Sequence, residues 1–399
     1  MTDTTIHSII LKVAAPCNLN CTYCYEYNRG DSTWKTKPKR IAETTVEQVG
    51  RRIFEYATAE QLSSISINLH GGEPTLLGPD GLDTVLTSLR RMTTGLRVKF
   101  GMQTNGTLVT EALVETLIRH EVKVGLSLDG DAYSNRHRID HRGRQSWGAA
   151  VAGLRILQEA GLLAGIQAVI DLESDPEAVL DQLGQFRPPE IELGQPFGNH
   201  DNPPFAVSGR TLGAWLIRAY EHLRASPHLA GIRVNVISDA FGAILTERSR
   251  SDWFPSAAPG YLVIATDGTY EGLDTLKVVG EAGRVLNLNV HEHTITQALG
   301  HEFIAARSPE RQLPTECRTC PIQSWCRGGY YPTRFGRGRG FDNPSIYCSS
   351  LMQLFTHFGL ACLEHPDVPL LSRQRIKSQL QRLTVSARGV SNEIVGGSS

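Results

Sequence analysis

Three cysteines near the start of the chain constrain it more than any other feature. They form the segment Cys17-Asn-Leu-Asn-Cys21-Thr-Tyr-Cys24, directly after the apolar run at residues 9–13. Thiolates this close together usually bind a metal ion or an iron–sulfur cluster. A four-iron cluster held by three protein sulfurs leaves one iron open to a small molecule. The alternatives are a zinc knuckle, which needs a fourth Cys or His nearby, and reduced structural thiols.

The composition is that of an ordinary globular protein. The 399 residues are 40% apolar and 20% charged, with a formal charge of −1. Such a balance gives no reason to expect nucleic acid or a membrane as a partner. The chain shows neither a signal-peptide pattern nor a run of about 18 apolar residues, so we expect a cytoplasmic protein.

Strand and helix patterns alternate along the first half of the chain. Strands are expected at residues 9–13, 64–70, 97–104, 122–129, 164–171 and 190–193, and helices at 42–59, 82–92, 110–120, 146–160 and 176–186. This alternation predicts a parallel sheet with covering helices, in the form of a partly closed barrel. Ligands of such sheets bind at the carboxyl ends of the strands.

Polar or glycine-bearing motifs stand at these strand ends. They are Gly71-Gly72-Glu73-Pro74, Gln103-Thr-Asn105-Gly, Ser127-Leu-Asp129-Gly and the basic segment 136–142. Each motif alone could be a turn. Together with the Cys-x3-Cys-x2-Cys spacing, they resemble the radical S-adenosylmethionine (SAM) enzymes, in which the open iron binds the amino and carboxylate groups of SAM.

The resemblance implies an α/β fold, a partial (β/α)6 radical SAM barrel, and a set of SAM contacts. Gly71, Gly72 and Glu73 would receive the ammonium group of SAM, and Tyr23 would pack on the adenine. Ribose and carboxylate contacts would come from Gln103, Asn105, Ser127, Asp129 and Arg138. Of these, Ser127 and Arg138 are the favoured direct contacts, whereas Asn105 and Asp129 could equally be turn residues.

A second group of cysteines lies near the other end of the chain. Cys317, Cys320, Cys326 and Cys348 form a four-thiolate pattern that fits either zinc or a cubane cluster. The pattern resembles the SPASM extension of radical SAM peptide maturases, which usually holds two auxiliary clusters. Here the sequence departs from that extension, because Tyr330 replaces its next cysteine and residues 261–277, around the predicted Asp267-Gly268 hairpin, contain none. We therefore expect two [4Fe–4S] clusters, one that binds SAM and one auxiliary. Cys362, in a predicted helix at 351–363, is interpreted as a structural thiol.

The segments 328–334 and 341–348 resemble a subgroup of SPASM maturases that cross-link side chains of ribosomally made peptides. These enzymes join an aromatic ring carbon to the β-carbon of a residue two positions away, which makes a cyclophane. The implied partners are a precursor peptide and an electron donor such as flavodoxin or ferredoxin. The alternatives are thioether formation, epimerisation, oxidation of Ser or Cys as in sulfatase maturation, and a non-catalytic iron–sulfur or zinc regulator.

Two further assignments concern charged residues. Asp274 resembles in placement the aspartate that acts as base in sulfatase-maturing enzymes, and its alternative is a hydrogen-bonded turn residue. A basic group in the C-terminal part could contact an acidic leader peptide or could be a solvated loop. This group consists of Arg327, Arg334, Arg337 and Arg339.

The expected domains are a radical SAM barrel at 1–200, a helical linker at 201–260, a SPASM-like domain at 261–364 and a partly disordered polar tail at 365–399. No separate N-terminal recognition module is expected, because the first strand begins by residue 8.

Overall fold

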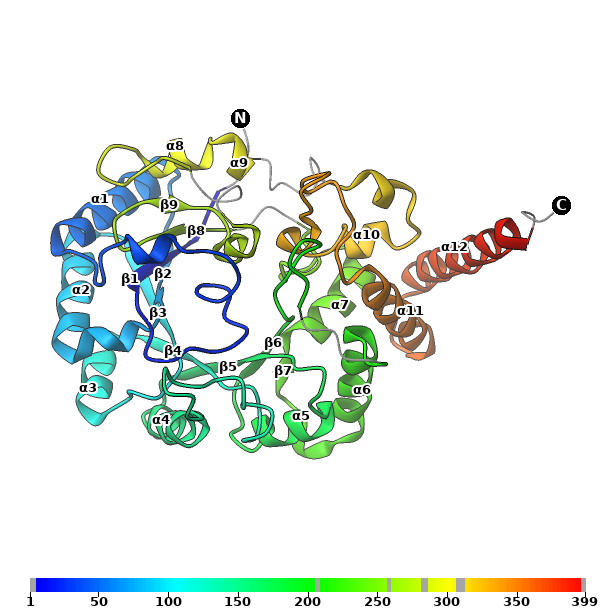
Figure 1. Cartoon of the computed structure of the whole chain (residues 1–399), viewed down its shortest axis with the longest axis horizontal. Coiled ribbons are helices and arrows are strands. Elements are labelled where there is room, and N and C mark those ends of the chain that lie inside the picture. The colour runs from blue at the N-terminus through cyan, green and yellow to red at the C-terminus, as the bar shows by residue number, and fades with distance from the viewer. Residues whose placement is uncertain (1–4, 205–208, 257–259, 281–285, 306–312, 396–399) are drawn as a thin grey trace.

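The computed structural model describes residues 5–204, 209–256, 260–280, 286–305 and 313–395, and its centre is one curved nine-stranded sheet (Figure 1). The strand order is β7-β6-β5-β4-β3-β2-β1-β8-β9. The strands are β1 (Ser8–Ala14), β2 (Ser64–Gly71), β3 (Arg97–Thr104), β4 (Lys123–Ser127), β5 (Leu163–Val169), β6 (Glu190–Gly194), β7 (Arg233–Val234), β8 (Tyr261–Ile264) and β9 (Tyr270–Glu271). Neighbours pair in parallel throughout, except for the antiparallel pair of β8 and β9. The predicted parallel sheet is thus confirmed.

Five helices cover the outer face of the sheet (Figure 1). They are α1 (Glu43–Ala59), α2 (Gly78–Met92), α3 (Glu111–Arg119), α4 (Trp147–Glu159) and α5 (Pro176–Gly184). Local sequence sets their starts: the Thr110 hydroxyl accepts from the Leu113 amide at α3, and Asp175 with Pro176 begins α5.

Alternation along the strands decides which side chains face the inside of the barrel. On β2, Ile65, Ile67 and Leu69 are buried, whereas the side chains between them are only half-buried. Because successive side chains point to opposite faces, Asn68 and His70 lie on the inner face. The inner, carboxyl-end side of the sheet therefore carries polar groups.

The predicted hairpin around Asp267-Gly268 is present, but its place in the sheet was not predicted. Strand β8 pairs in parallel with β1, from Ser8↔Tyr261 to Leu11↔Ile264. Gly268 takes a φ of +83° in the turn, a conformation that favours glycine. The C-terminal part of the chain thus extends the sheet next to its first strand.

The rest of the chain is mainly helical. Most of its helices pack at the β6–β7 side of the sheet and beyond it, whereas the two short helices within residues 295–305 lie on the other side, near α1 and β9 (Figure 1). The helices are α6 (Leu212–Ala225), α7 (Asn235–Thr246), α8 (Ile295–Leu299), α9 (Glu302–Ala305), α10 (Gln323–Cys326), α11 (Cys348–Glu364) and α12 (Leu370–Val395). Short 3-10 helices are η1 (Thr33–Lys35), η2 (Pro74–Leu77), η3 (Pro227–Leu229), η4 (Asp274–Val279), η6 (Thr315–Thr319) and η7 (Tyr331–Arg334). Phe241 of α7 stacks on Phe358 of α11 with ring centroids 4.7 Å apart.

Helix α12 differs from the expected polar tail. Its residues Ile376, Leu380 and Leu383 recur at helical spacing and belong to the main core or pack against it, which gives the helix an apolar face. Residues 370–395 are thus assigned to a helix, and partial disorder of the tail stays a prediction. None of the described helices has the length and apolarity that crossing a membrane requires.

Candidate active site

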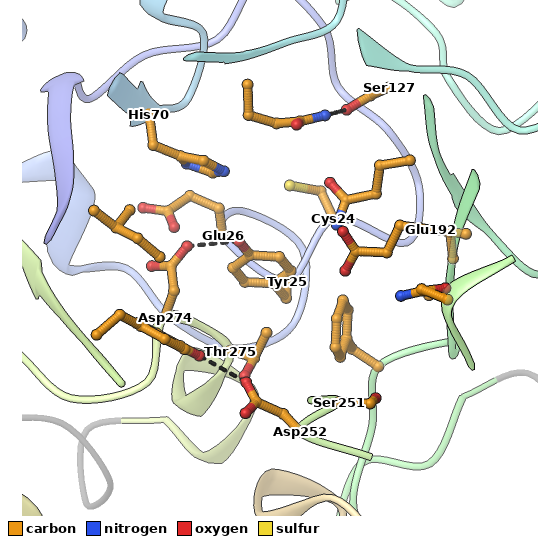
Figure 2. Close-up of a pocket in the computed structure, with 18 of the residues that line it drawn as sticks. Cys24, Tyr25, Glu26, His70, Ser127, Glu192, Ser251, Asp252, Asp274 and Thr275 are labelled. Atoms are coloured by element: carbon orange, nitrogen blue, oxygen red, sulfur yellow. Dashed lines mark hydrogen bonds between the residues drawn. The ribbon is translucent and has the colours of Figure 1, made fainter. Parts of the chain in front are cut away.

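A cavity of about 1070 Å³ opens at the carboxyl ends of the barrel strands (Figure 2). It brings together almost every residue that the sequence analysis assigned to the SAM site. Cys17, Cys21, Tyr23, Cys24, Gly71, Gly72, Glu73, Gln103, Asn105, Ser127, Arg138 and Asp274 all line it. Asp129 is the exception, since it lies behind this lining.

The first three cysteines lie on the loop that leaves β1. The Leu19 amide and the Asn105 side-chain amide donate to Cys17 Sγ, at 3.3 and 3.8 Å. Burial raises the pKa of all three thiols, that of Cys24 to about 12. Three half-buried cysteines at one wall of a cavity suit a cluster, because metal coordination supplies the positive charge that deprotonates a thiol.

Gly71 and Gly72 allow the end of β2 to approach the start of the cysteine loop. A Cβ atom on Gly71 would lie 2.1 Å from the Ala14 carbonyl oxygen, and one on Gly72 would lie 2.3 Å from the Pro16 carbonyl oxygen. The Gly72 amide instead donates to the Ala14 carbonyl at 2.8 Å. The two glycines thus have a packing reason in addition to their predicted role in binding SAM.

Glu73 is almost fully buried and ties two strand ends together. Its carboxylate accepts from the Thr75 amide and hydroxyl, from the Thr104 hydroxyl at 2.7 Å and from the Asn105 amide at 2.8 Å. Burial raises its pKa, and these hydrogen bonds oppose that rise. Contact between Glu73 and the SAM ammonium group stays a prediction.

Arg138, Asp129 and Tyr23 form a buried network. The guanidinium donates twice to the Asp129 carboxylate, at 2.9 and 2.8 Å, and lies 5.5 Å from the centre of the Tyr23 ring. The Tyr23 hydroxyl also donates to Asp129. Burial alone would lower the pKa of Arg138, but Asp129, with smaller contributions from Tyr23 and Cys21, outweighs burial and raises that pKa. Asp129 therefore positions two cavity-lining side chains, which goes beyond the turn role that was its alternative.

The remaining predicted contacts come from neighbouring strand ends. Gln103 at the end of β3 donates to the Ser127 hydroxyl at the end of β4, at 2.8 Å. The Asn105 side chain bonds both Asn18, at 2.9 Å, and the Thr107 amide, at 3.0 Å. Asn105 is thus a turn residue that also supports the cysteine loop.

A buried charge cluster, which the sequence analysis missed, lies behind another wall of the cavity and contributes Glu26 and Asp274 to its lining. It consists of Lys12, Glu26, Glu271, Asp274 and Lys277. Lys12 Nζ lies 2.9 Å from Glu26, 3.4 Å from Glu271 and in close contact with Asp274, and Lys277 pairs with the same three carboxylates. The cluster joins β1 and the cysteine loop to the β9–η4 segment. The signal in the sequence was a single lysine inside the apolar run at 9–13.

Within this cluster, Asp274 is held as a carboxylate. The Tyr25 hydroxyl donates to its Oδ2 at 2.6 Å (Figure 2), and the Lys12 ammonium lies in ion-pair contact with its Oδ1. Burial would raise the pKa of Asp274, but Lys12 and Lys277 outweigh burial and hold it well below its ordinary value. Asp274 lies in the cavity wall, as its predicted role requires, and that role as base stays a prediction.

Glu192 on β6 lies across the cavity from Asp274 (Figure 2). Burial, Glu190 and Asp252 raise the pKa of its carboxyl group. The sequence analysis did not identify it, because one glutamate in a short strand carries no signal of its own.

The four C-terminal cysteines line a second, small cavity of about 20 Å³. Burial raises the pKa of Cys317 to about 11 and that of Cys326 to about 12, and the neighbouring thiols contribute. Four sulfurs around one small space fit the predicted auxiliary cluster with full ligation. Cys362 is buried in α11 and does not line this cavity.

Tyr330 belongs to a separate apolar cluster and lines the large cavity. It packs with Leu273 and Leu276, and its hydroxyl bonds Thr275. Phe197, Tyr261, Val279, Tyr331 and Phe341 surround this group. Aliphatic and aromatic side chains thus occupy the region in which the SPASM extension usually has further cysteines, namely position 330 and residues 261–277.

The four arginines of the C-terminal part do not form one surface. Arg334 is buried, donates to the carbonyls of Gly329 and Arg327 and faces Cys326 and Cys317. Arg337 is exposed, and Arg339 pairs with Glu316. The prediction that Arg334 contacts a leader peptide is therefore wrong, because its guanidinium is buried and donates to backbone carbonyls of the protein.

The barrel and the three-cysteine loop have the fold and the site of a radical SAM domain. Residues 12–179 match the radical SAM superfamily. The cofactors of this class, SAM and iron–sulfur clusters, fit the two cysteine sites.

Particular proteins share the fold or the sequence. The serine-type anaerobic sulfatase-maturating enzyme of Klebsiella aerogenes is 26% identical over 336 residues, which covers 81% of this chain and 79% of that protein. The structure of anSMEcpe with bound AdoMet superposes with a TM-score of 0.76 at 19% identity, over 89% of this chain and 97% of that one. Streptococcus suis SuiB bound to the precursor peptide SuiA gives a TM-score of 0.60 at 17% identity, over 86% and 76% of the two chains.

Proposed function

We propose that this chain is a radical SAM enzyme that oxidises a ribosomally made peptide by joining an aromatic ring carbon to the β-carbon of a residue two positions away. One observation carries the proposal: a single large cavity unites the three-cysteine loop with the Glu26 and Asp274 carboxylates of the buried charge cluster. The four-cysteine site lies outside the lining of that cavity. Such a chain can generate a radical, hold a peptide side chain next to it and pass an electron to a separate site.

The cavity has room for both reactants. Its volume of about 1070 Å³ is at the upper end of the range for small-molecule sites, about 300–1,000 Å³. A SAM molecule and a short peptide segment can therefore share it. When bound, SAM supplies a 5′-deoxyadenosyl radical that removes a hydrogen atom from a substrate carbon, and the auxiliary cluster supplies an electron acceptor. The protein orients one C–H bond and excludes water.

A second candidate is oxidation of a Ser or Cys side chain. It is favoured by the relatives, which are named as sulfatase-maturating enzymes and align with 81% of this chain. The C-terminal part carries what favours the cross-link instead, because its segments 328–334 and 341–348 resemble the cyclophane-forming subgroup. That part keeps four cysteines, and Tyr330 with its aliphatic neighbours stands where further cysteines were expected.

The test uses the anaerobically reconstituted chain, SAM, a strong reductant and peptides encoded by short reading frames beside its gene. The expected result is 5′-deoxyadenosine together with a peptide that has lost two hydrogens. The tandem mass spectrum of this peptide should lack fragments from cleavage between the linked residues. The peptide should not react with a hydroxylamine probe.

Three outcomes would overturn the proposal. Reaction with hydroxylamine would identify an aldehyde and establish Ser or Cys oxidation. An unchanged mass with deuterium incorporated from the solvent would identify epimerisation. Absence of 5′-deoxyadenosine under strong reduction, with zinc at both cysteine sites, would identify a non-catalytic protein.

A further inference from the structure

His70 has a position from which it can reach a substrate. It is near the end of β2, on the inner face of the sheet, and lines the large cavity. Across the strand pair its partner is Lys12. Figure 2 shows the imidazole and Asp274, from different elements, pointing into the space that also contains Cys24.

The imidazole is not committed to holding the fold together. Its Nδ1 atom is buried and has no hydrogen-bond partner within the described part of the chain. A buried polar atom without a partner is unusual in folded proteins and calls for an explanation. Asp274 differs, because its Oδ2 accepts from the Tyr25 hydroxyl and its Oδ1, although without a hydrogen bond, is ion-paired with Lys12.

Burial inside a cluster of opposite charges favours the neutral form of His70. Lys12, Glu26, Asp274 and Lys277 face it from β1, the cysteine loop and η4. Burial lowers the pKa of His70, and the two lysines lower it further, whereas Asp274 and Glu26 oppose them. A neutral imidazole at neutral pH can accept a proton, and the carboxylate of Asp274 can stabilise the cation that forms.

We propose that His70 accepts the proton that leaves the aromatic ring when the cross-link forms. This inference rests on the proposed function. The radical removes a hydrogen atom from the β-carbon, and a bond then forms between that carbon and a ring carbon. Restoring aromaticity breaks the ring C–H bond: the electron leaves to the auxiliary cluster and the proton goes to His70. Asp274 acts as a positioning residue that stabilises the imidazolium.

The first test compares the wild-type chain with His70→Gln, with both clusters in place. General bases contribute about 10²–10⁴-fold, so cross-linked peptide should fall by at least about 10²-fold. Formation of 5′-deoxyadenosine should continue, uncoupled from product. Deuterium on the substrate ring should slow product formation more in His70→Gln than in the wild type, because loss of the ring proton becomes rate-limiting.

The matched control is His357→Gln on α11, where the imidazole pairs with Glu221 away from the cavity. It should behave like the wild type. A His70→Gly variant gives a second readout: added imidazole should restore cross-linking. The ring of His70, observed by ¹³C-histidine NMR in the chain with oxidised clusters, should be neutral at pH 7.

Several results would refute the role of His70. They are wild-type product formation by His70→Gln, an unchanged ring-deuterium effect, no rescue by imidazole, or a charged ring at pH 7. A wild-type chain that makes no cross-link overturns the proposed function itself, so the two failures can be told apart.

Discussion

Replacing Lys12 by Met should destabilise the fold through the buried charge cluster. In the wild type, two lysines face three carboxylates within this cluster. Lys12→Met leaves Lys277 alone against all three. Removing one partner from a buried ion pair costs about 3–5 kcal/mol. With an unfolding entropy of about 2.1 cal/mol/K per residue, this loss corresponds to a fall in melting temperature of roughly 4–6 °C for a chain of this length.

The assay is differential scanning calorimetry of the anaerobically reconstituted protein, with exposed Lys99→Met on β3 as the matched control, expected within about 0.5 kcal/mol of the wild type. Adding Glu26→Gln to Lys12→Met restores the wild-type balance of one excess negative charge, so the double variant should regain about 0.5–3 kcal/mol. A Lys12→Met protein as stable as the wild type, or a double variant whose losses simply add, would refute the reasoning.

The pH dependence of the unfolding free energy gives an independent check of the direction of the carboxylate pKa shifts. In the wild type, Lys12 and Lys277 outweigh burial and lower the pKa values of Asp274 and Glu271, so their stabilisation is present above about pH 4 and is lost only in acid. Without Lys12, burial raises these pKa values above those of the unfolded chain. The folded Lys12→Met protein then binds more protons than its unfolded chain. The stability that it has lost relative to the wild type should therefore become smaller as the pH falls from 8 to 6. A constant deficit would contradict this assignment.

Three further variants test the site. Cys326→Ser should lower iron from about eight to about four atoms per chain and abolish cross-linking while SAM cleavage remains; unchanged iron would remove this residue from the ligand set. Asp129→Asn should weaken SAM binding about 10–100-fold in calorimetric titration, because two charge-assisted bonds to Arg138 are lost, and unchanged affinity would refute its positioning role. Asp274→Asn should keep SAM cleavage and lower product at least about 10-fold, whereas full cross-linking would exclude this carboxylate from proton transfer.

Much of the barrel was predictable, because its signals are local. Alternation on β2 and helical spacing on α1 place these elements from a few neighbouring residues. The motifs at the strand ends were predictable as a set, since the carboxyl ends of parallel strands meet at one edge. The cavity accordingly includes Gly72, Gln103 and Ser127.

The unpredicted features depend on pairs that are distant in sequence. Lys12 and Lys277 meet the same carboxylates although 265 positions separate them. No local pattern shows that β8 pairs with β1. Asp129 reads as a turn residue until Arg138 and Tyr23 are seen on its carboxylate. His70 stands out only once its unpartnered nitrogen is located inside the cavity.

The pairing of β8 with β1 bears on attempts to exchange parts between such enzymes. A chimera cut near residue 260 would strip the hydrogen-bonding edge from β1 and leave the ammonium group of Lys12 without Glu271 and Asp274. A donor C-terminal half must therefore bring a strand of matching register and carboxylates at equivalent places. Chimeras that preserve only the cysteine motifs should give insoluble protein. A working chimera should take the β8–β9 hairpin and η4 from the same donor as the C-terminal cysteines.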